Sequence, residues 1–243
     1  MSTGNVRLYA LNVSHPSVGA HLMLARKRID HRVLNIQPGL HPLVVRLAGF
    51  PANTVPALKI DGRSVQGSLA ISRALDELEP TPPLFPADAD ARRAVEEAEA
   101  WGERVLQPMP RRMYRWGLSR NRDLRRRLLE TSGMPAPGLT AALNGSLARA
   151  FASAIGADDD AVRRDLRELP VQLDHVDALI AEGVIGGAEP NAADFQIAPT
   201  LRVMLSFHDL APMVEWRPSA GLARRLVPEW PDEVPRFLPD EWL

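Results

Sequence analysis

The hydrophobic and polar positions divide the chain into a first part with both strand and helix patterns and a later part with helical patterns alone. Val6–Leu11 is an apolar run of strand length, and apolar residues then recur at helical spacing over Val18–Ile29, with Ser17 as the expected cap. His31–Ile36 predicts a second strand and Leu43–Ala48 a short helix. Two strands joined by one helix predict a parallel βαβ unit.

The stretch Thr54–Ser68 carries the most specific local pattern. Val55–Ile60 is an apolar strand with β-branched residues at its ends, and Arg63–Gln66 predicts a short return strand. Between them, Asp61-Gly62 supplies the two residues that tolerate a positive φ in a two-residue turn. The sequence therefore predicts a β-hairpin here.

Two residues at the ends of this hairpin indicate a binding site. Ser68 starts a helix that continues to about Glu79, and we expect it to be the N-cap. The free N–H groups and the dipole at such a helix start also favour a carboxylate or phosphate. Pro56 removes a ladder hydrogen bond from the strand, which indicates either an edge strand or a cis bond that presents the backbone of Val55 to a ligand.

The character of the chain changes after Glu79. Four prolines in the nine residues of Pro80–Asp88 predict a linker, and the periodicity beyond it is helical. Asn191-Ala-Ala-Asp194 predicts a capping box at the start of one of these later helices, and a further short helix is expected near Gly221–Leu226. The patterns predict an α/β N-terminal domain with the order βαβαββα over residues 1–80, a Pro-rich linker over 81–89, and an all-α C-terminal helical bundle over 90–243 with an extended Pro-rich tail.

Composition narrows the classes of function. The 243 residues are 45% hydrophobic with a formal net charge of −1, which is typical of a soluble globular protein and lacks the basic excess of nucleic-acid-binding domains. Without cysteine, any thiol chemistry must use a thiol from another molecule. The start Met1-Ser-Thr-Gly-Asn5 has no secretion signal, and no run reaches the ~20 apolar residues that span a bilayer. We therefore expect a cytoplasmic protein with no nucleic-acid or membrane partner.

The segment Ser14-His15-Pro16-Ser17 lies between the first strand and the first helix. A hydroxyl at the positive end of a helix can donate a hydrogen bond to a bound thiolate, which lowers the pKa of that thiol. The alternative is an ordinary loop with a helix cap. A nucleophile pair of Ser14 and His15 is disfavoured, because adjacent residues seldom align nucleophile and base and no nucleophile-elbow motif is present.

Other polar residues give weaker indications. The six histidines show no metal-ligand spacing, so no metal is expected, but His41 is kept as a possible ligand contact. The arginine-rich stretch Arg111–Arg127 can bind an acidic ligand or form a solvated helix face. Gln107, Arg111 and Tyr114 are candidate contacts for a second substrate, although aromatic residues at helical spacing are more typical of a core.

Together these features resemble the glutathione S-transferase family, over about Val6 to Leu210. The resemblance is carried by Val55-Pro56-Ala57-Leu58, by the Asp61-Gly62 hairpin that leads to Ser68-Leu-Ala-Ile71, and by Asn191-Ala-Ala-Asp194. It implies a thioredoxin-like N-terminal domain followed by a helical domain, and a homodimer. It also implies glutathione, or a related low-molecular-weight thiol, as co-substrate for attack on a small electrophile, without a metal.

The resemblance assigns roles to single residues. The backbone of Val55 would pair with the cysteinyl part of glutathione, and Ser68 would hold the γ-glutamyl carboxylate. Ser14, preferred over Ser17, would be the catalytic hydroxyl of a serine-type active site.

One position departs from the family pattern. The family usually has an acidic residue or Gln directly before the helix-start Ser, where this chain has Gly67 and places Gln66 one residue earlier. Gln66 is kept as a candidate thiol contact. Two alternatives stay open: a glutathione-dependent isomerase on the same fold, and a non-catalytic binding or assembly module that kept the fold and lost the thiol site.

Overall fold

The computed structural model describes residues 5–243, which form two compact units. The first comprises the chain up to Glu103 together with Ile180–Pro199, and the second comprises Arg104–Leu179 and Thr200–Leu243. The first four residues, which belong to the start examined for a secretion signal, lie outside the described residues. The domain boundaries at residues 80 and 90 stay a prediction.

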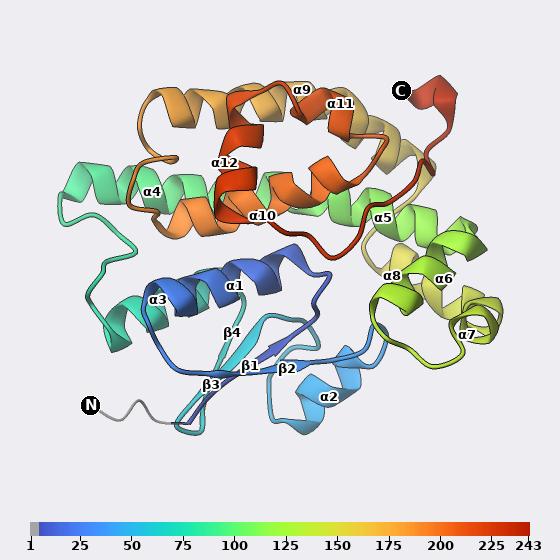
Figure 1. The fold of residues 1–243 in the computed structure, drawn as a ribbon, viewed down its shortest axis with the longest axis horizontal. Coiled ribbons are helices and arrows are strands. Elements are labelled where there is room, and N and C mark those ends of the chain that lie inside the picture. Colours follow the sequence, from blue (N-terminus) through green and yellow to red (C-terminus); the bar gives the residue numbers. More distant parts are fainter. Residues whose placement is uncertain (1–4) are drawn as a thin grey trace. The chain divides into compact units, whose positions relative to one another are not determined.

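The first unit is built on one four-stranded mixed sheet with the order β2-β1-β3-β4 (Figure 1). β1 pairs in parallel with β2, and the other pairs are antiparallel. The predicted order βαβαββα is confirmed. The elements of this order and the helix that follows are β1 Val6–Ala10, α1 His15–Arg26, β2 Arg32–Asn35, α2 His41–Leu47, β3 Ala57–Ile60, β4 Arg63–Gln66, α3 Ser68–Leu78 and α4 Ala89–Trp101.

The hairpin between β3 and β4 is confirmed, and so is a cis bond before Pro56, whereas the presentation of the Val55 backbone to a ligand stays a prediction. Asp61 and Gly62 have φ values of 49° and 88°, as a two-residue hairpin turn requires. The bond between Val55 and Pro56 is cis, whereas β3 lies inside the sheet between β1 and β4. The edge-strand interpretation is therefore wrong, and Pro56 is tolerated because it directly precedes the strand.

Two expected helix caps are wrong by one or more residues. α1 begins at His15 with Ser14 as its N-cap, so Ser17 is the third helical residue; its Oγ accepts a weak hydrogen bond from the Leu11 N–H at 3.5 Å. This earlier start places a proline in the first turn of the helix. A backbone N–H there would have no intrahelical acceptor, so proline, which lacks an N–H, fits the position. α3 likewise has Gly67 as N-cap, so Ser68 is its first helical residue.

The buried face of α1 also differs from the apolar stripe expected from the sequence. Ala20, Met23 and Leu24 are fully buried, whereas Val18 and Leu22 are half-buried. The helix packs closely against the start of α10 (Ala192–Ser206): a Cβ added to Gly19 would collide with the carbonyl oxygen of Phe195. Small residues on this face therefore allow the close approach.

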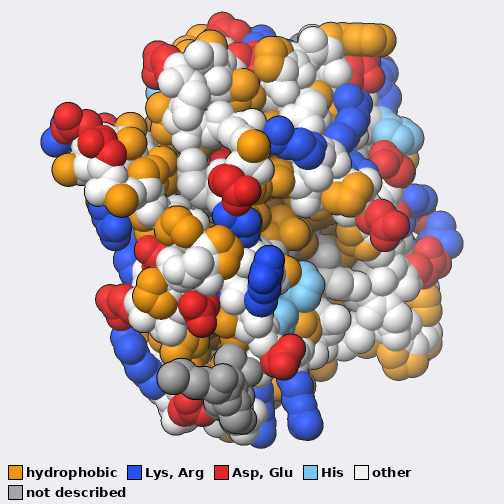
Figure 2. All heavy atoms as spheres, turned by 60° about the vertical axis from the view of Figure 1, so that its left-hand side comes forward, with side chains coloured by type: hydrophobic (Ala, Val, Ile, Leu, Met, Phe, Trp, Pro, Cys, Tyr) orange, Lys and Arg blue, Asp and Glu red, His pale blue; other side chains and the backbone are white. Residues whose placement is uncertain are grey.

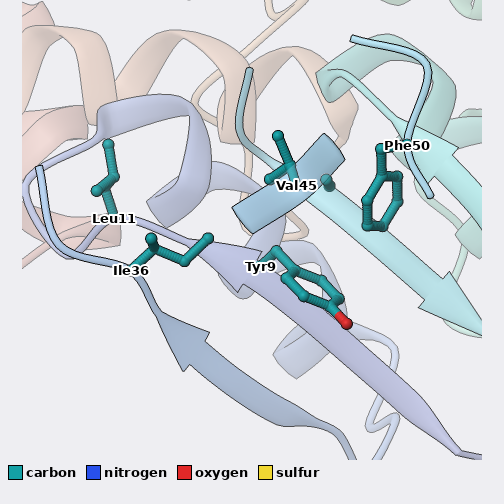
Figure 3. Close-up of a cluster of buried hydrophobic side chains, with 6 residues drawn as sticks. Tyr9, Leu11, Ile36, Val45 and Phe50 are labelled. Carbon is teal, nitrogen blue, oxygen red and sulfur yellow. The ribbon is translucent and has the colours of Figure 1, made fainter. Parts of the chain in front are cut away.

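A cluster of buried side chains fixes the end of the sheet nearest α2. Tyr9, Leu11, Ile36, Val45 and Phe50 come together from β1, α2 and the loops beside them (Figure 3). The rings of Tyr9 and Phe50 meet edge to face with centroids 5.2 Å apart. Such a pair contributes about 0.5–1.5 kcal/mol beyond its area burial, so it holds the segment after α2 against β1.

A buried ion pair joins α1, α3 and the linker. Lys27, which is 2% exposed, donates from Nζ to Asp76 Oδ1 at 2.6 Å and to the Glu79 carbonyl at 2.7 Å. Asp76 Oδ1 also accepts the Leu84 N–H at 2.8 Å. Desolvating an ammonium is costly unless a carboxylate and further hydrogen bonds compensate it, as they do here.

The capping box at the start of α10 is confirmed. Asn191 Oδ1 accepts the N–H groups of Ala193 and Asp194 at 3.0 and 3.2 Å, and Asp194 Oδ2 accepts the Asn191 N–H at 2.9 Å. Asp194 Oδ1 also accepts the Gly186 N–H at 2.7 Å. The box therefore fixes the preceding turn as well as the helix start.

The remaining elements are helical, as predicted for the later part of the chain. They are a π-helical turn Gly102–Leu106, α5 Pro108–Arg120, α6 Arg122–Thr131, α7 Pro137–Leu143, α8 Gly145–Ala154, α9 Asp159–Ala181, α10 Ala192–Ser206, α11 Ala211–Val214, α12 Pro218–Leu226 and a final 3₁₀ turn Asp240–Trp242. None of the helices within residues 5–243 is both long and apolar enough to cross a membrane.

The C-terminal tail packs within the second unit. Val234 pairs with Phe207, and both residues are buried together with Leu238. Asp209 Oδ2 accepts the N–H groups of Phe237 and Leu238 at 2.9 and 3.0 Å. The tail is therefore held by buried side chains and by a carboxylate that caps its backbone.

We predict that Asp76→Ala lowers the free energy of unfolding by about 3–5 kcal/mol, because it leaves the buried Lys27 ammonium without its carboxylate. Glu96→Ala is the matched control, since it removes an exposed ion pair with Arg92 on α4 and should cost at most about 0.5 kcal/mol. Urea unfolding followed by circular dichroism measures both. Equal costs for the two variants would show that the Lys27 pair does not stabilise the unit.

Candidate functional site

The strand ends that carry the candidate thiol-binding residues meet at one edge of the sheet. The parallel strands β1 and β2 both end there, with Ala10 opposite Asn35. β3 begins at this edge, with Ala57 opposite Tyr9, and β4 ends at it, with Gln66 opposite Ala57. The loops attached to these four strand ends therefore share one edge.

Four predicted residues lie in those loops or at the helix starts that follow them. Ser14 follows β1, His41 is the first residue of α2 after β2, Val55 precedes β3, and Ser68 is the first residue of α3 after β4. The structure thus brings the segments that carry Ser14, Val55 and Ser68 to the same edge, and His41 begins the helix that follows β2.

Ser14 stands at the N-terminus of α1 with its backbone extended. Its N–H donates to the Leu11 carbonyl and its carbonyl accepts the Val18 N–H, each at 3.0 Å, but its side chain makes no capping hydrogen bond. Ser14 is half-buried, and His15 beside it is buried. A hydroxyl that is not used as a cap, at the positive end of a 12-residue helix, is suitably placed to donate to an anion.

Gly67 and Ser68 form the start of α3. Gly67 has φ 90° and ψ 150°, donates its N–H to the Pro56 carbonyl at 3.0 Å, and accepts the Ile71 N–H at 3.0 Å. This backbone region is almost restricted to glycine, so Gly67 is required by the turn. Ser68 is buried, and the N–H groups of the first turn of a helix have no intrahelical partners.

Val55 and Gln66 differ in what they offer a ligand. Val55 is half-buried and lies outside the strand pairing, which begins at Ala57. The Gln66 amide is already used: Oε1 accepts the Ala52 N–H at 2.9 Å, and Nε2 donates to the carbonyls of Ala52 and Thr54 at 3.0 and 2.7 Å. Gln66 thus holds the loop that leads to Val55, and its role as a thiol contact stays a prediction.

The three candidates for the second substrate belong to the second unit. Gln107 is the buried N-cap of α5, and Arg111 and Tyr114 follow on that helix, Arg111 being exposed. The Tyr114 ring packs against Phe207 and Phe237, with centroid distances of 5.3 and 6.3 Å. Burial raises the pKa of Tyr114, and the charge of nearby Asp232 raises it further, so its hydroxyl stays protonated. The roles of all three stay predictions.

Several arginines of the basic stretch are engaged within the second unit. They form ion pairs between Arg112 and Asp165, Arg120 and Asp159, and Arg127 and Asp232. Arg125 instead donates to the Leu118 and Ala141 carbonyls. These side chains hold neighbouring segments together. Arg111, Arg120, Arg122, Arg126 and Arg127 are nevertheless exposed, as expected of a solvated helix face, and binding of an acidic ligand stays a prediction. Within residues 5–243, no group of three or more His, Asp or Glu side chains is placed to hold a metal ion.

Sequence reasoning missed the charged pairs that position α3, the helix carrying Ser68. Lys27 joins it to α1, and Arg73 on α3 forms an ion pair with fully buried Glu99 on α4. Burial raises the pKa of Glu99, and hydrogen bonds from Ser72 and Arg73 oppose that rise. The sequence did contain a sign that Lys27 is buried. Lys27 follows buried apolar positions of α1 by three and four residues, and so lies on the same helix face.

Comparison with known proteins gives a family match for the first unit. Residues 8–83 match the model of the family described as glutathione S-transferase, N-terminal domain. The maleylacetoacetate isomerases of Mus musculus and Rattus norvegicus are each 35% identical to this chain over 99 residues, which is 39% of this chain and 46% of each relative. The chain thus matches slightly less than half the length of these curated relatives.

Solved structures share the fold along nearly the whole chain. A β-etherase from Sphingobium has a TM-score of 0.67 at 16% identity, covering 90% of this chain and 93% of its own. A glutathione S-transferase from Methylobacterium radiotolerans, in complex with glutathione sulfonate, has a TM-score of 0.61 at 20% identity, covering 97% and 98%. The predicted combination of a thioredoxin-like domain with a helical C-terminal region is therefore confirmed as a fold.

We predict that Gly67→Ala destabilises the protein by about 1–3 kcal/mol, because the added Cβ has open space but the backbone conformation disfavours any L side chain. Gly221→Ala is the matched control: it also has open space, lies inside α12 without a positive φ, and should stabilise by about 0.5–1 kcal/mol. Thermal unfolding monitors both variants. A neutral Gly67→Ala would refute a backbone requirement at this turn.

Proposed function

Because residues 8–83 match the model of the glutathione S-transferase N-terminal domain family, we propose that this protein is a glutathione transferase-like enzyme. It binds a low-molecular-weight thiol, with glutathione the leading candidate, in the first unit. It stabilises the thiolate through the Ser14 hydroxyl and directs it to a small electrophile. The proposal includes a homodimer in the cytoplasm without a metal, in keeping with the family resemblance.

The observation that carries this proposal is the meeting of three different backbone features at one edge of the sheet. The N-terminus of α1 supplies Ser14, the N-terminus of α3 supplies Ser68, and the segment before β3 supplies the backbone of Val55. Two helix N-termini and one unpaired strand extension suit an extended, peptide-like anion.

Each part of the thiol has a proposed contact. The γ-glutamyl carboxylate accepts from Ser68 and from the first-turn N–H groups of α3, which the helix dipole supports. The cysteinyl backbone pairs with that of Val55, which strand pairing leaves unused. Gln66 supports this contact by holding the loop through Ala52 and Thr54, and His41 is a further contact on α2.

In the catalytic step the main task of the protein is to lower the pKa of the bound thiol. A free thiol with a pKa of about 8.5 is mostly protonated at neutral pH, and a donated hydrogen bond at a helix N-terminus raises its thiolate fraction. Ser14 is proposed as that donor because its hydroxyl makes no capping bond. The thiolate then attacks the electrophile, for which Gln107, Arg111 and Tyr114 are proposed contacts.

A glutathione-dependent isomerase is the second candidate. It is supported by the match to two maleylacetoacetate isomerases at 35% identity over 99 residues. The same thiolate would add to a substrate double bond and leave again after rotation, so the thiol is regenerated. Glutathione consumption separates the two: a transferase consumes one thiol per product, whereas an isomerase consumes none.

Ser14→Ala should lower the thiol-dependent rate by at least about tenfold while the circular dichroism spectrum is unchanged, because the thiolate loses its donor. Ser17→Ala is the matched control: it removes a hydroxyl three residues away that accepts a weak hydrogen bond from the Leu11 N–H, and it should keep most of the activity. The assay covers several electrophiles and one isomerisable substrate. Wild-type rates for Ser14→Ala on all of them would exclude Ser14 as the donor.

Calorimetric titration with glutathione tests the binding site itself. We expect binding at millimolar concentrations or below, and Ser68→Ala should weaken it about tenfold, because a hydrogen bond to a charged group contributes about 1.5–3 kcal/mol. Ser64→Ala on the exposed part of β4 should bind as the wild type does. Absence of binding to the wild type at millimolar glutathione would overturn the glutathione assignment, and would favour another thiol or a non-catalytic binding module.

A further inference from the structure

Two histidine rings from separate elements of the first unit meet at the protein surface. His21 lies in the middle of α1, and His31 directly precedes β2. His21 Nδ1 is 3.0 Å from His31 Nε2, and the ring centroids are 5.0 Å apart at an interplanar angle of 66°. Histidine atoms are visible at the surface on the face drawn in Figure 2 (pale blue), among basic, acidic and hydrophobic side chains.

The hydrogen-bond partners define which nitrogen of each ring carries a proton. His31 Nδ1 lies 2.8 Å from the Ile29 carbonyl oxygen, which can only accept, so Nδ1 is the donor. In neutral His31 this leaves the lone pair on Nε2, which faces His21. His31 is thus held with Nε2 as the available metal-binding nitrogen, in the way that a backbone carbonyl orients metal-bound histidines.

We propose that His21 and His31 form a surface binding site for a divalent transition-metal ion, with Cu²⁺ as the ion bound most tightly. The ion is coordinated by His21 Nδ1 and His31 Nε2. His21 takes the tautomer with its proton on Nε2, so binding to the neutral pair releases no net proton. Water completes the coordination, because within residues 5–243 no third His, Asp or Glu side chain is placed to complete a metal site.

The spacing of the two nitrogens suits a shared ion. Imidazole nitrogens bind such metals at about 2.0–2.1 Å, so two of them at angles from about 90° to tetrahedral are about 2.9–3.4 Å apart. The observed 3.0 Å lies within this range. An exposed histidine changes its ring orientation readily, so the ion can take the place of the hydrogen bond between the rings without a change in the backbone.

The chemistry of the two side chains favours a transition-metal ion, because neutral imidazole is a common ligand of such ions. Among divalent first-row ions, imidazole sites bind Cu²⁺ most tightly, followed by Ni²⁺ and Zn²⁺.

The site would link two elements that the sequence separates. The ion would connect the middle of α1 to the residue before β2, across the turn that joins them. An ion that binds only the folded protein stabilises it by mass action, so saturating metal should raise the unfolding temperature. This effect gives a second measurement that is independent of the binding titration and of any enzymatic activity.

The test uses the full chain without a histidine tag, titrated with Cu²⁺ and separately with Zn²⁺ at pH 7.5 in a non-chelating buffer. We expect one Cu²⁺ per chain, with two imidazole nitrogens visible in its electron paramagnetic resonance spectrum. His21→Gln keeps a hydrogen-bond donor toward His31 but removes one ligand, and should weaken Cu²⁺ binding by at least about tenfold and abolish the rise in unfolding temperature.

His31→Ala should have the same effect as His21→Gln, and His208→Ala, which changes an exposed histidine of the second unit, should bind as the wild type does. Circular dichroism establishes that each variant is folded. Wild-type Cu²⁺ affinity in both His21→Gln and His31→Ala would overturn the proposal. A spectrum with one coordinated imidazole nitrogen would also overturn it.

Discussion

The buried ion pair between Lys27 and Asp76 is the constraint on which the geometry of the first unit depends. α1 and α3 carry Ser14 and Ser68 at their N-termini, and this pair joins the two helices near their other ends. A buried ammonium tolerates few arrangements, because it needs its carboxylate and its remaining acceptors at hydrogen-bond distance. The relative placement of the two helix starts thus follows from a contact far along each helix from the proposed thiol site.

The sequence predicted most of the first unit because its local signals are strong. The Asp61-Gly62 turn, the strands beside it and the Asn191–Asp194 capping box are each specified by a few neighbouring residues, and all are confirmed. The segments of Ser14, Val55 and Ser68 were also predicted to form one site, and the strand register brings them to one edge of the sheet. Their chemical roles are not tested by the fold.

The remaining features depend on contacts between distant residues, which local patterns do not contain. Lys27 was missed because a lysine is normally assigned to solvent, and its partner lies 49 residues away. The buried face of α1 was misassigned because small residues there meet the Phe195 carbonyl of α10, so bulk was a poor guide to burial. Gly67 differs from the family pattern, and its φ of 90° gives a backbone reason for glycine that the sequence alone did not show.

The first unit is assembled from two separate parts of the chain, and this determines when its fold can be completed during synthesis. Its sheet lies within the first third of the chain, but Ile180–Pro199 belongs to the same unit and is synthesised much later. Until then the Leu84 carbonyl lacks the Ala192 N–H, Arg26 lacks Glu189, and the small-residue face of α1 lacks α10. When only the thioredoxin-like segment has been synthesised, the first unit is therefore incomplete. The helices that carry the proposed thiol site complete their packing only near the end of translation.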